Sequence, residues 1–304
     1  MNRILLFLAA PLAFAPLTSH AQDTTDTSTI ITTATPAAEP TFSQGILFPY
    51  SLFDRALETR VSKTGTVDYS ALKANPDLDR FLLAVATADT SKFPVFQIAP
   101  TEEELKKNRN AKTRTDRSTE LVFWINAYNA HVLKAISDAY PINSPDEIKD
   151  FDTAPRRVAN QNLSFAEMRA KIAQMDRRAL FAITDGTQGG PLMNPKAYRW
   201  SELNALLDNA ASSFINGPDN VAVTRIANRV EIAPYLVSVN QYFVDGGISG
   251  GAERRKLTGV RYLLSTYADK RAERSYLTGG DYMLQVRQPN RRLNMEGLTL
   301  RKLD

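Results

Sequence analysis

The sequence contains no cysteine, and this absence removes several kinds of chemistry. Thiolate nucleophiles, disulfides and cysteine-bound metals are all excluded. Histidine is almost as scarce, because only His20 and His131 occur. A metal site built from several histidines of one chain is therefore not expected, and we assign no metal.

The sequence also lacks an excess of charge of one sign. Its 37 Lys and Arg residues nearly balance its 33 Asp and Glu residues, which leaves a net charge of +4 at pH 7. Such a mixed surface lacks the basic field that nucleic-acid binding needs, so no nucleic-acid partner is expected. Two short basic runs, Arg254–Lys256 and Arg291-Arg292, are typical of solvated faces.

Long hydrophobic runs are missing as well, apart from a short one near the start. Met1–Arg3 is positively charged, and the apolar stretch Ile4–Pro16 follows it. This stretch is shorter than the roughly 20 residues that a membrane-spanning helix needs. Small residues at Ser19 and Ala21 fit signal-peptidase cleavage after Ala21. The pattern predicts a signal peptide over residues 1–21, a periplasmic or secreted protein, and no stable membrane insertion.

Residues 22–44 are rich in Thr, Ala and Pro and carry few large apolar side chains, so we expect a disordered lead. A globular domain is predicted over residues 45–304. Apolar spacing and turn residues indicate a helix-rich α+β single domain with a small sheet. Helices are expected at 50–62, 118–139, 164–175, 200–215, 234–243 and 256–268, a buried strand at 179–184, a strand pair at 221–232, and an irregular end from Gln285. Ser164 and Glu167 form a capping-box pattern at the start of the third of these helices.

The segment Phe123–Asn129 reads Phe-Trp-Ile-Asn-Ala-Tyr-Asn, and further blocks accompany it in order. These blocks are Gly65, Val67-Asp68-Tyr69 and Leu72 upstream, and Asp176–Ile183, Gly190-Pro191-Leu192 and Tyr198 downstream. With them the chain resembles the domain of unknown function 547 family over roughly residues 50–270. The Cys and His positions of that family suggest a hydrolase, so the resemblance implies a papain- or transglutaminase-like outline.

The polar positions of the family are replaced in this chain. Leu180 stands at the position of a family His, Asp185 at that of the first Cys, and Gly190 at that of the second Cys. Arg169-Ala170 replace a Glu-His pair, and Pro289–Asn294 replace the family's terminal Tyr-Asp-Trp-Ser-Leu-Asn. The resemblance therefore implies a family scaffold without the Cys–His chemistry.

The loop from Asp185 to Gly190 follows the predicted buried strand, and loops in such places often carry function. Asp185 is a candidate general base or cation ligand, and Thr187 and Gln188 are candidate binding residues. The same Asp-Gly sequence also fits an ordinary tight turn. The glycines do not form a phosphate-binding pattern that leads into a helix, so no cofactor is expected.

Three polar residues lie on the apolar helix predicted over 118–139. Asn126 and Asn129 are three residues apart and share a face. They either line a cleft as binding residues or brace the loop after Thr184 from inside the core. His131 is the second candidate catalytic residue, as a general base, unless it is simply packed in the fold.

Three functions fit these observations. The first is a non-catalytic binding module for an envelope protein or a cell-wall fragment. The second is a hydrolase that uses Asp185 in place of the family thiol, and it predicts that Asp185→Asn lowers the rate by at least about 100-fold. The third is a domain that only supports folding or assembly in the envelope.

Overall fold

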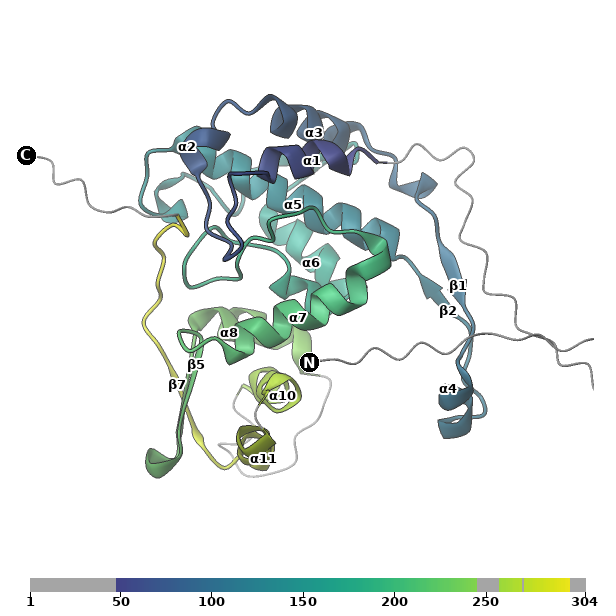
Figure 1. Cartoon of the computed structure of the whole chain (residues 1–304), viewed down its shortest axis with the longest axis vertical. Coiled ribbons are helices and arrows are strands. Elements are labelled where there is room, and N and C mark those ends of the chain that lie inside the picture. Colours follow the sequence, from purple (N-terminus) through teal and green to yellow (C-terminus); the bar gives the residue numbers. More distant parts are fainter. Residues whose placement is uncertain (1–47, 245–256, 270, 296–304) are drawn as a thin grey trace, which may run out of the picture. The chain divides into compact units, whose positions relative to one another are not determined.

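The computed structural model describes residues 48–244, 257–269 and 271–295 (Figure 1). The predicted signal peptide (1–21) and lead (22–44) lie outside the described residues, and so does the basic run Arg254–Lys256. In the described part of the chain, no helix combines the length and the apolar character that crossing a membrane requires.

Helices dominate the structure, and the strands form three small sheets, which confirms the helix-rich α+β class. The helices are α1 (Tyr50–Leu57), α2 (Tyr69–Leu72), α3 (Pro76–Thr87), α4 (Glu102–Lys107), α5 (Ser118–Ala139), α6 (Phe165–Met175), α7 (Leu203–Asn216), α8 (Pro234–Val239), α10 (Thr258–Tyr267) and α11 (Arg271–Gly279). The strands are β1 (Phe96–Ile98), β2 (Arg114–Asp116), β3 (Arg156–Val158), β4 (Gln161–Leu163), β5 (Val221–Thr224), β6 (Arg229–Ile232) and β7 (Met283–Val286).

Helix α5 is the centre of the domain and spans the predicted residues. It is buried almost all round, and Trp124 is completely inaccessible to solvent. Helices α2, α3 and α6 pack against it (Figure 1). Pro141 follows the helix and cannot continue it. A helix that is apolar on every face needs such neighbours, so the sequence of α5 determines where the other helices pack.

Helix α6 begins with the predicted capping box. The Glu167 side chain accepts a hydrogen bond of 2.8 Å from the Ser164 backbone N–H, and the Ser164 hydroxyl accepts one of 3.2 Å from the Glu167 N–H. These two bonds satisfy backbone donors that the first turn of a helix otherwise leaves free.

The predicted strand pair around Asn228 is also confirmed. Strands β5 and β6 are antiparallel, and Asn228 in the turn between them adopts a left-handed conformation with φ of 48°. Strand β7 then pairs with β6 in parallel. The sequence did not predict β7, because the stretch from Gln285 was expected to be irregular.

The predicted strand over 179–184 is wrong. Residues Arg177–Phe181 form a 3₁₀ helix, η3, whose first turn is capped by the Asp176 side chain at the Arg178 N–H (2.9 Å). A short buried apolar run fits a strand and a helical turn equally well by pattern alone. The local cap, together with side-chain partners from α5 for the residues that follow, decides the conformation here.

Candidate functional site

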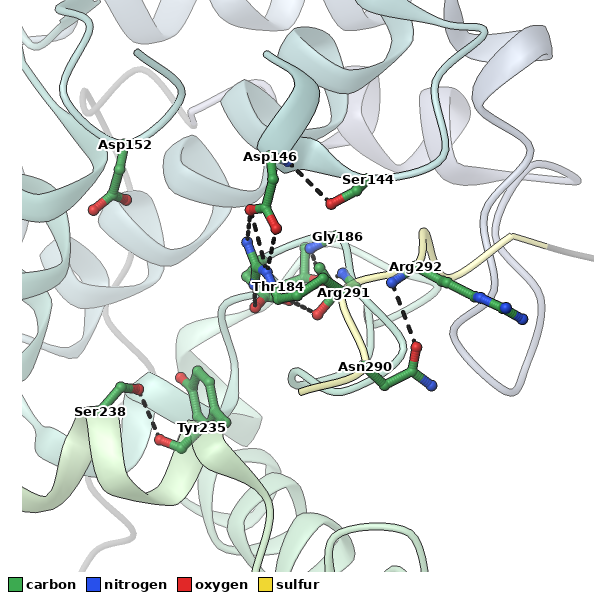
Figure 2. Close-up of polar contacts among 12 residues, drawn as sticks. Ser144, Asp146, Asp152, Thr184, Gly186, Tyr235, Ser238, Asn290, Arg291 and Arg292 are labelled. Carbon is green, nitrogen blue, oxygen red and sulfur yellow. Dashed lines mark hydrogen bonds and ion pairs between the residues drawn. The ribbon is translucent and has the colours of Figure 1, made fainter. Parts of the chain in front are cut away.

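A pocket of about 170 Å³ lies between three segments that are far apart in the sequence. These are the Asp185 loop (residues 185–190), helix α8, and the strap, which we define as residues 289–294. Figure 2 shows Tyr235 and Ser238 on α8 on one side, and Asn290 and Arg291 of the strap on the other. The lining residues are Asp185, Thr187, Gly189, Pro234, Tyr235, Ser238, Pro289, Asn290 and Arg291.

Helix α5 fixes the start of the Asp185 loop from inside the core. The Asn129 amide donates to the Ala182 carbonyl (3.0 Å), and its oxygen accepts from the Thr184 N–H (2.9 Å). Gly186 follows with φ of 78°, where a Cβ would lie 2.2 Å from Ile136 Cδ1 of the same helix. Only glycine fits this left-handed position against α5, so the chain turns sharply there.

The Asp185 carboxylate is held by three hydrogen bonds, two from its own loop and one from the strap. Its Oδ1 accepts hydrogen bonds from the Thr187 N–H (2.9 Å) and from the Thr187 hydroxyl (2.7 Å). Its Oδ2 accepts one from Arg291 Nη1 (2.9 Å). The side chain is 22% exposed. The loop therefore contains the predicted turn and also places a carboxylate in the wall of the pocket.

The strap pairs with the Asp185 loop through backbone hydrogen bonds. The Gln188 N–H donates to the Arg292 carbonyl (2.8 Å), and the Asn294 N–H donates to the Gly186 carbonyl (3.0 Å). The Gln188 side chain donates to the Leu293 carbonyl (3.2 Å). Gln188 was expected to bind a ligand, but here its side chain holds the strap.

Arg291 joins the strap to two carboxylates, and Figure 2 shows its guanidinium against one of them, Asp146. Besides Asp185 it contacts Asp146, to which Nη2 donates at 2.6 Å and Nε at 3.1 Å. The bonds from Arg291 hold the pKa of Asp146 below its usual range. Asp146 is more than half exposed, so this part of the pair adds little stability. The main effect of Asp146 is to fix the direction of the Arg291 guanidinium. The sequence predicted only that Arg291 lies on a solvated face, and not this pairing.

Gly190 makes room for the Asp185 carboxylate. A Cβ on Gly190 would lie 2.1 Å from Asp185 Oδ1, far inside van der Waals contact. Because that oxygen is already held by Thr187, the carboxylate has to rotate away and lose its partners. The two positions that the resemblance aligns with family cysteines, Asp185 and Gly190, are therefore direct neighbours in the structure.

We expect Gly190→Ala to lower the unfolding free energy by about 1–3 kcal/mol, the usual cost of an overpacked site. Urea denaturation measures it, with Gly279→Ala as the matched control, because a Cβ there meets nothing within 4 Å. In an Asp185→Ala background the Gly190→Ala cost is expected to fall to a few tenths of a kcal/mol. An equal cost in both backgrounds would contradict the steric explanation.

His131 also lies on α5, but it interacts with Arg156 and with the Arg157 backbone rather than with the Asp185 loop. Burial first, and then the charge of Arg156, lower the pKa of His131 to about 4, while the Arg157 backbone acts in the opposite direction. Its Nε2 is buried and has no hydrogen-bond partner among the described residues. Among the described residues, His131 and Asp185 share no hydrogen-bond partner, and the role of His131 as a general base stays a prediction.

Asn126 and Asn129 both brace the backbone, and neither is among the residues that line the pocket. Both side chains are completely buried. The Asn126 amide donates to the Tyr198 carbonyl (3.1 Å), and its oxygen accepts from the Tyr198 N–H (2.8 Å). The two asparagines thus position the backbone on either side of the Asp185 loop without facing the pocket.

The pocket residues that the sequence did not predict come from α8 and the strap. Tyr235 donates its hydroxyl proton to the Leu180 carbonyl of η3, and Ser238 donates to the Tyr235 carbonyl (2.7 Å). Burial, as the largest cause, raises the pKa of Tyr235 well above its usual value. No sequence motif marks these residues. They line the pocket only because α8 packs beside a loop about 50 residues earlier in the chain. Within the described ranges, no group of three or more acidic or histidine side chains could hold a metal ion.

Residues 112–215 match the family model described as "Protein of unknown function, DUF547". This segment, which contains α5, α6 and the Asp185 loop, is similar to that family over about a third of the chain. No curated protein and no solved structure matches the chain. The papain- or transglutaminase-like outline therefore stays a prediction. Helix α8 and the strap lie outside the matched segment. The pocket is therefore lined partly by residues of the matched segment and partly by residues outside it.

Proposed function

We propose that this protein is an exported, non-catalytic binding module whose pocket takes one group of a cell-wall fragment. The observation that carries the proposal is the state of Asp185, whose two oxygens accept three hydrogen bonds from Thr187 and Arg291. Three of the about four lone pairs of the carboxylate are therefore taken. These bonds hold Asp185 in place as an acceptor rather than leaving it free to turn toward a proton it would remove, and its remaining lone pair can receive a hydrogen bond from a ligand in the pocket.

The size of the pocket favours part of a ligand rather than a whole one. Sites that enclose drug-sized molecules measure about 300–1,000 Å³. A volume of about 170 Å³ suits a single side chain or one sugar-sized group. A cell-wall fragment offers such groups in a repeating chain. The signal-peptide pattern of residues 1–21 supports the proposal, because it predicts export to the compartment where the cell wall lies.

A hydrolase is the second candidate, and one observation favours it. The Thr187 hydroxyl donates to the Asp185 carboxylate at 2.7 Å, which is also the geometry of a nucleophile and its base. The Thr187 N–H donates to the same oxygen, however, as in an ordinary Asx turn. Thr187 is only 1% exposed, so its hydroxyl is poorly placed to attack a substrate.

The test is a thermal-shift screen of the purified protein against cell-wall fragments. A ligand at about 100 times its dissociation constant adds about 2.7 kcal/mol of stability. For a domain of this size that corresponds to a rise in Tm of about 5–10 °C. Ser238→Tyr, which fills the pocket from α8, is expected to abolish the shift. Ser51→Tyr, at an exposed serine of α1 outside the lining, serves as the matched control.

Recovery of the fragment separates the two candidates. A binding module returns it intact, and we expect no product over many hours. A cleaved fragment, with cleavage lost in Asp185→Asn, would establish the hydrolase instead. A shift that Ser238→Tyr leaves unchanged would place the ligand elsewhere and refute the pocket as the site.

A further inference from the structure

The hydroxyl groups that line the pocket all direct their protons into the protein. Thr187 donates to Asp185 (2.7 Å), Ser238 donates to the Tyr235 carbonyl (2.7 Å), and Tyr235 donates to the Leu180 carbonyl. A hydroxyl that has given away its only proton offers lone pairs alone. The hydroxyls of Ser238 and Tyr235 can therefore accept a hydrogen bond from a ligand but not donate one, while Thr187 is buried at 1% exposure.

Four of the lining residues offer the ligand no backbone donor either. Pro234 and Pro289 have no N–H at all. The Gly189 N–H donates to the Asn290 carbonyl (3.0 Å), and the Thr187 N–H donates to Asp185 (2.9 Å). Of the lining side chains, the Asn290 amide donates one of its two N–H groups to Gln188 (3.1 Å). Acceptors are thus prominent in the wall, and Arg291 is the only cationic side chain among the lining residues.

The two carboxylates that contact Arg291 carry more charge than its guanidinium. One guanidinium faces two carboxylates, Asp185 and Asp146, so these three groups sum to one negative charge. All three guanidinium nitrogens donate to one or the other of them. The negative charge of Asp185 still extends beyond this pair, because it raises the pKa of the buried Tyr69, with burial as the larger cause. An anion would gain little in such a site.

We propose that the group bound in this pocket is a primary ammonium, of the kind that ends a lysine-type side chain in a cell-wall peptide. The inference rests on the proposed function for the source of the ligand, but its chemistry comes from the pocket itself. An ammonium carries three donors and no acceptor, which complements Asp185, Tyr235 and Ser238. It stays charged at pH 7, since its usual pKa is about 10.4.

Two pairs of probes test the inference by calorimetry. The first pair is the tripeptide Nα-acetyl-L-Ala-γ-D-Glu-L-Lys, whose only amine is that of the lysine side chain, and its Nε-acetyl form. The second pair is Nα-acetyl-lysine amide and its Nε-acetyl form, which contain no other cell-wall group. Acetylation removes the charge and two of the three donors while the chain is kept. We expect it to weaken binding by about tenfold or more in both pairs, as the loss of a charge-assisted hydrogen bond does.

Variants then assign the effect to the pocket. Asp185→Asn is expected to weaken binding of the free amines about tenfold or more and to leave binding of the acetylated probes unchanged. Asp219→Asn removes the same charge from an exposed residue outside the lining and is expected to change neither. If Asp185→Asn does not fold, Ser238→Ala removes one acceptor from the exposed side of α8 and is expected to weaken the free amines several-fold.

Each outcome has a distinct meaning. Discrimination in both pairs supports the ammonium and the cell-wall source together. Discrimination in the lysine pair alone supports the ammonium and refutes the cell-wall source. Equal binding of free and acetylated tripeptides, abolished by Ser238→Tyr, keeps the proposed function and overturns the ammonium. If no probe binds, the ammonium proposal is wrong.

Discussion

Lowering the pH from 7 to 5 is expected to cost the domain about 2 kcal/mol of unfolding free energy through His131 alone. Burial and the charge of Arg156 lower the pKa of His131 to about 4 in the folded protein. In the unfolded chain the pKa returns to about 6.5, so the unfolded chain takes up a proton that the folded one refuses. The stability is therefore complete above pH 6.5 and is lost as the pH falls toward 4.

Urea denaturation at pH 7, 6 and 5 measures this dependence. The carboxylates whose pKa values are lowered in the fold, such as Asp68 and Asp146, titrate below this range and contribute at lower pH. A chain that starts at Gln22 leaves His131 as the only histidine. In His131→Gln the unfolding free energy is expected to be nearly constant between pH 6.5 and 5. A slope that survives this substitution would show that another group is responsible.

The helical part of the fold could be read from the sequence because its signals are local. The boundaries of α5 follow from a continuous apolar run that ends before Pro141, and the start of α6 follows from Ser164 and Glu167 three residues apart. Such signals depend on neighbours within one or two turns. The strand expected over 179–184 is wrong because a short apolar run does not distinguish a strand from a helical turn, and the cap at Asp176 and the partners on α5 decide its conformation.

The candidate site was only half predictable. Asp185 and Thr187 were found because a turn sequence and the resemblance to a family both mark that loop. Arg291 was not, since a pair of adjacent arginines carries no information about a carboxylate 106 residues away. The same holds for Tyr235 and Ser238, whose hydroxyls matter only because α8 packs beside the loop. Long-range packing, rather than any local motif, builds the acceptor-rich wall.

Asn129→Ala is expected to lower the unfolding free energy by about 3–5 kcal/mol and to loosen the Asp185 loop. The substitution leaves the Ala182 carbonyl and the Thr184 N–H without a partner. Both residues are about 1% exposed, so water cannot replace the lost amide. Each unsatisfied buried group costs about 1–3 kcal/mol, and the small cavity adds to that.

Asn126→Ala is the matched control, because it removes an equivalent pair of bonds to Tyr198 from the same helix. Both variants are expected to lose similar stability in urea denaturation. Only Asn129→Ala is expected to accelerate hydrogen exchange at the Thr184 amide, by about tenfold or more, and to weaken ligand binding in the pocket, because Thr184 leads directly into Asp185. If the two variants gave the same exchange at Thr184, α5 would not be what holds the loop, and the position of Asp185 would have to be attributed to the strap and its Arg291 instead.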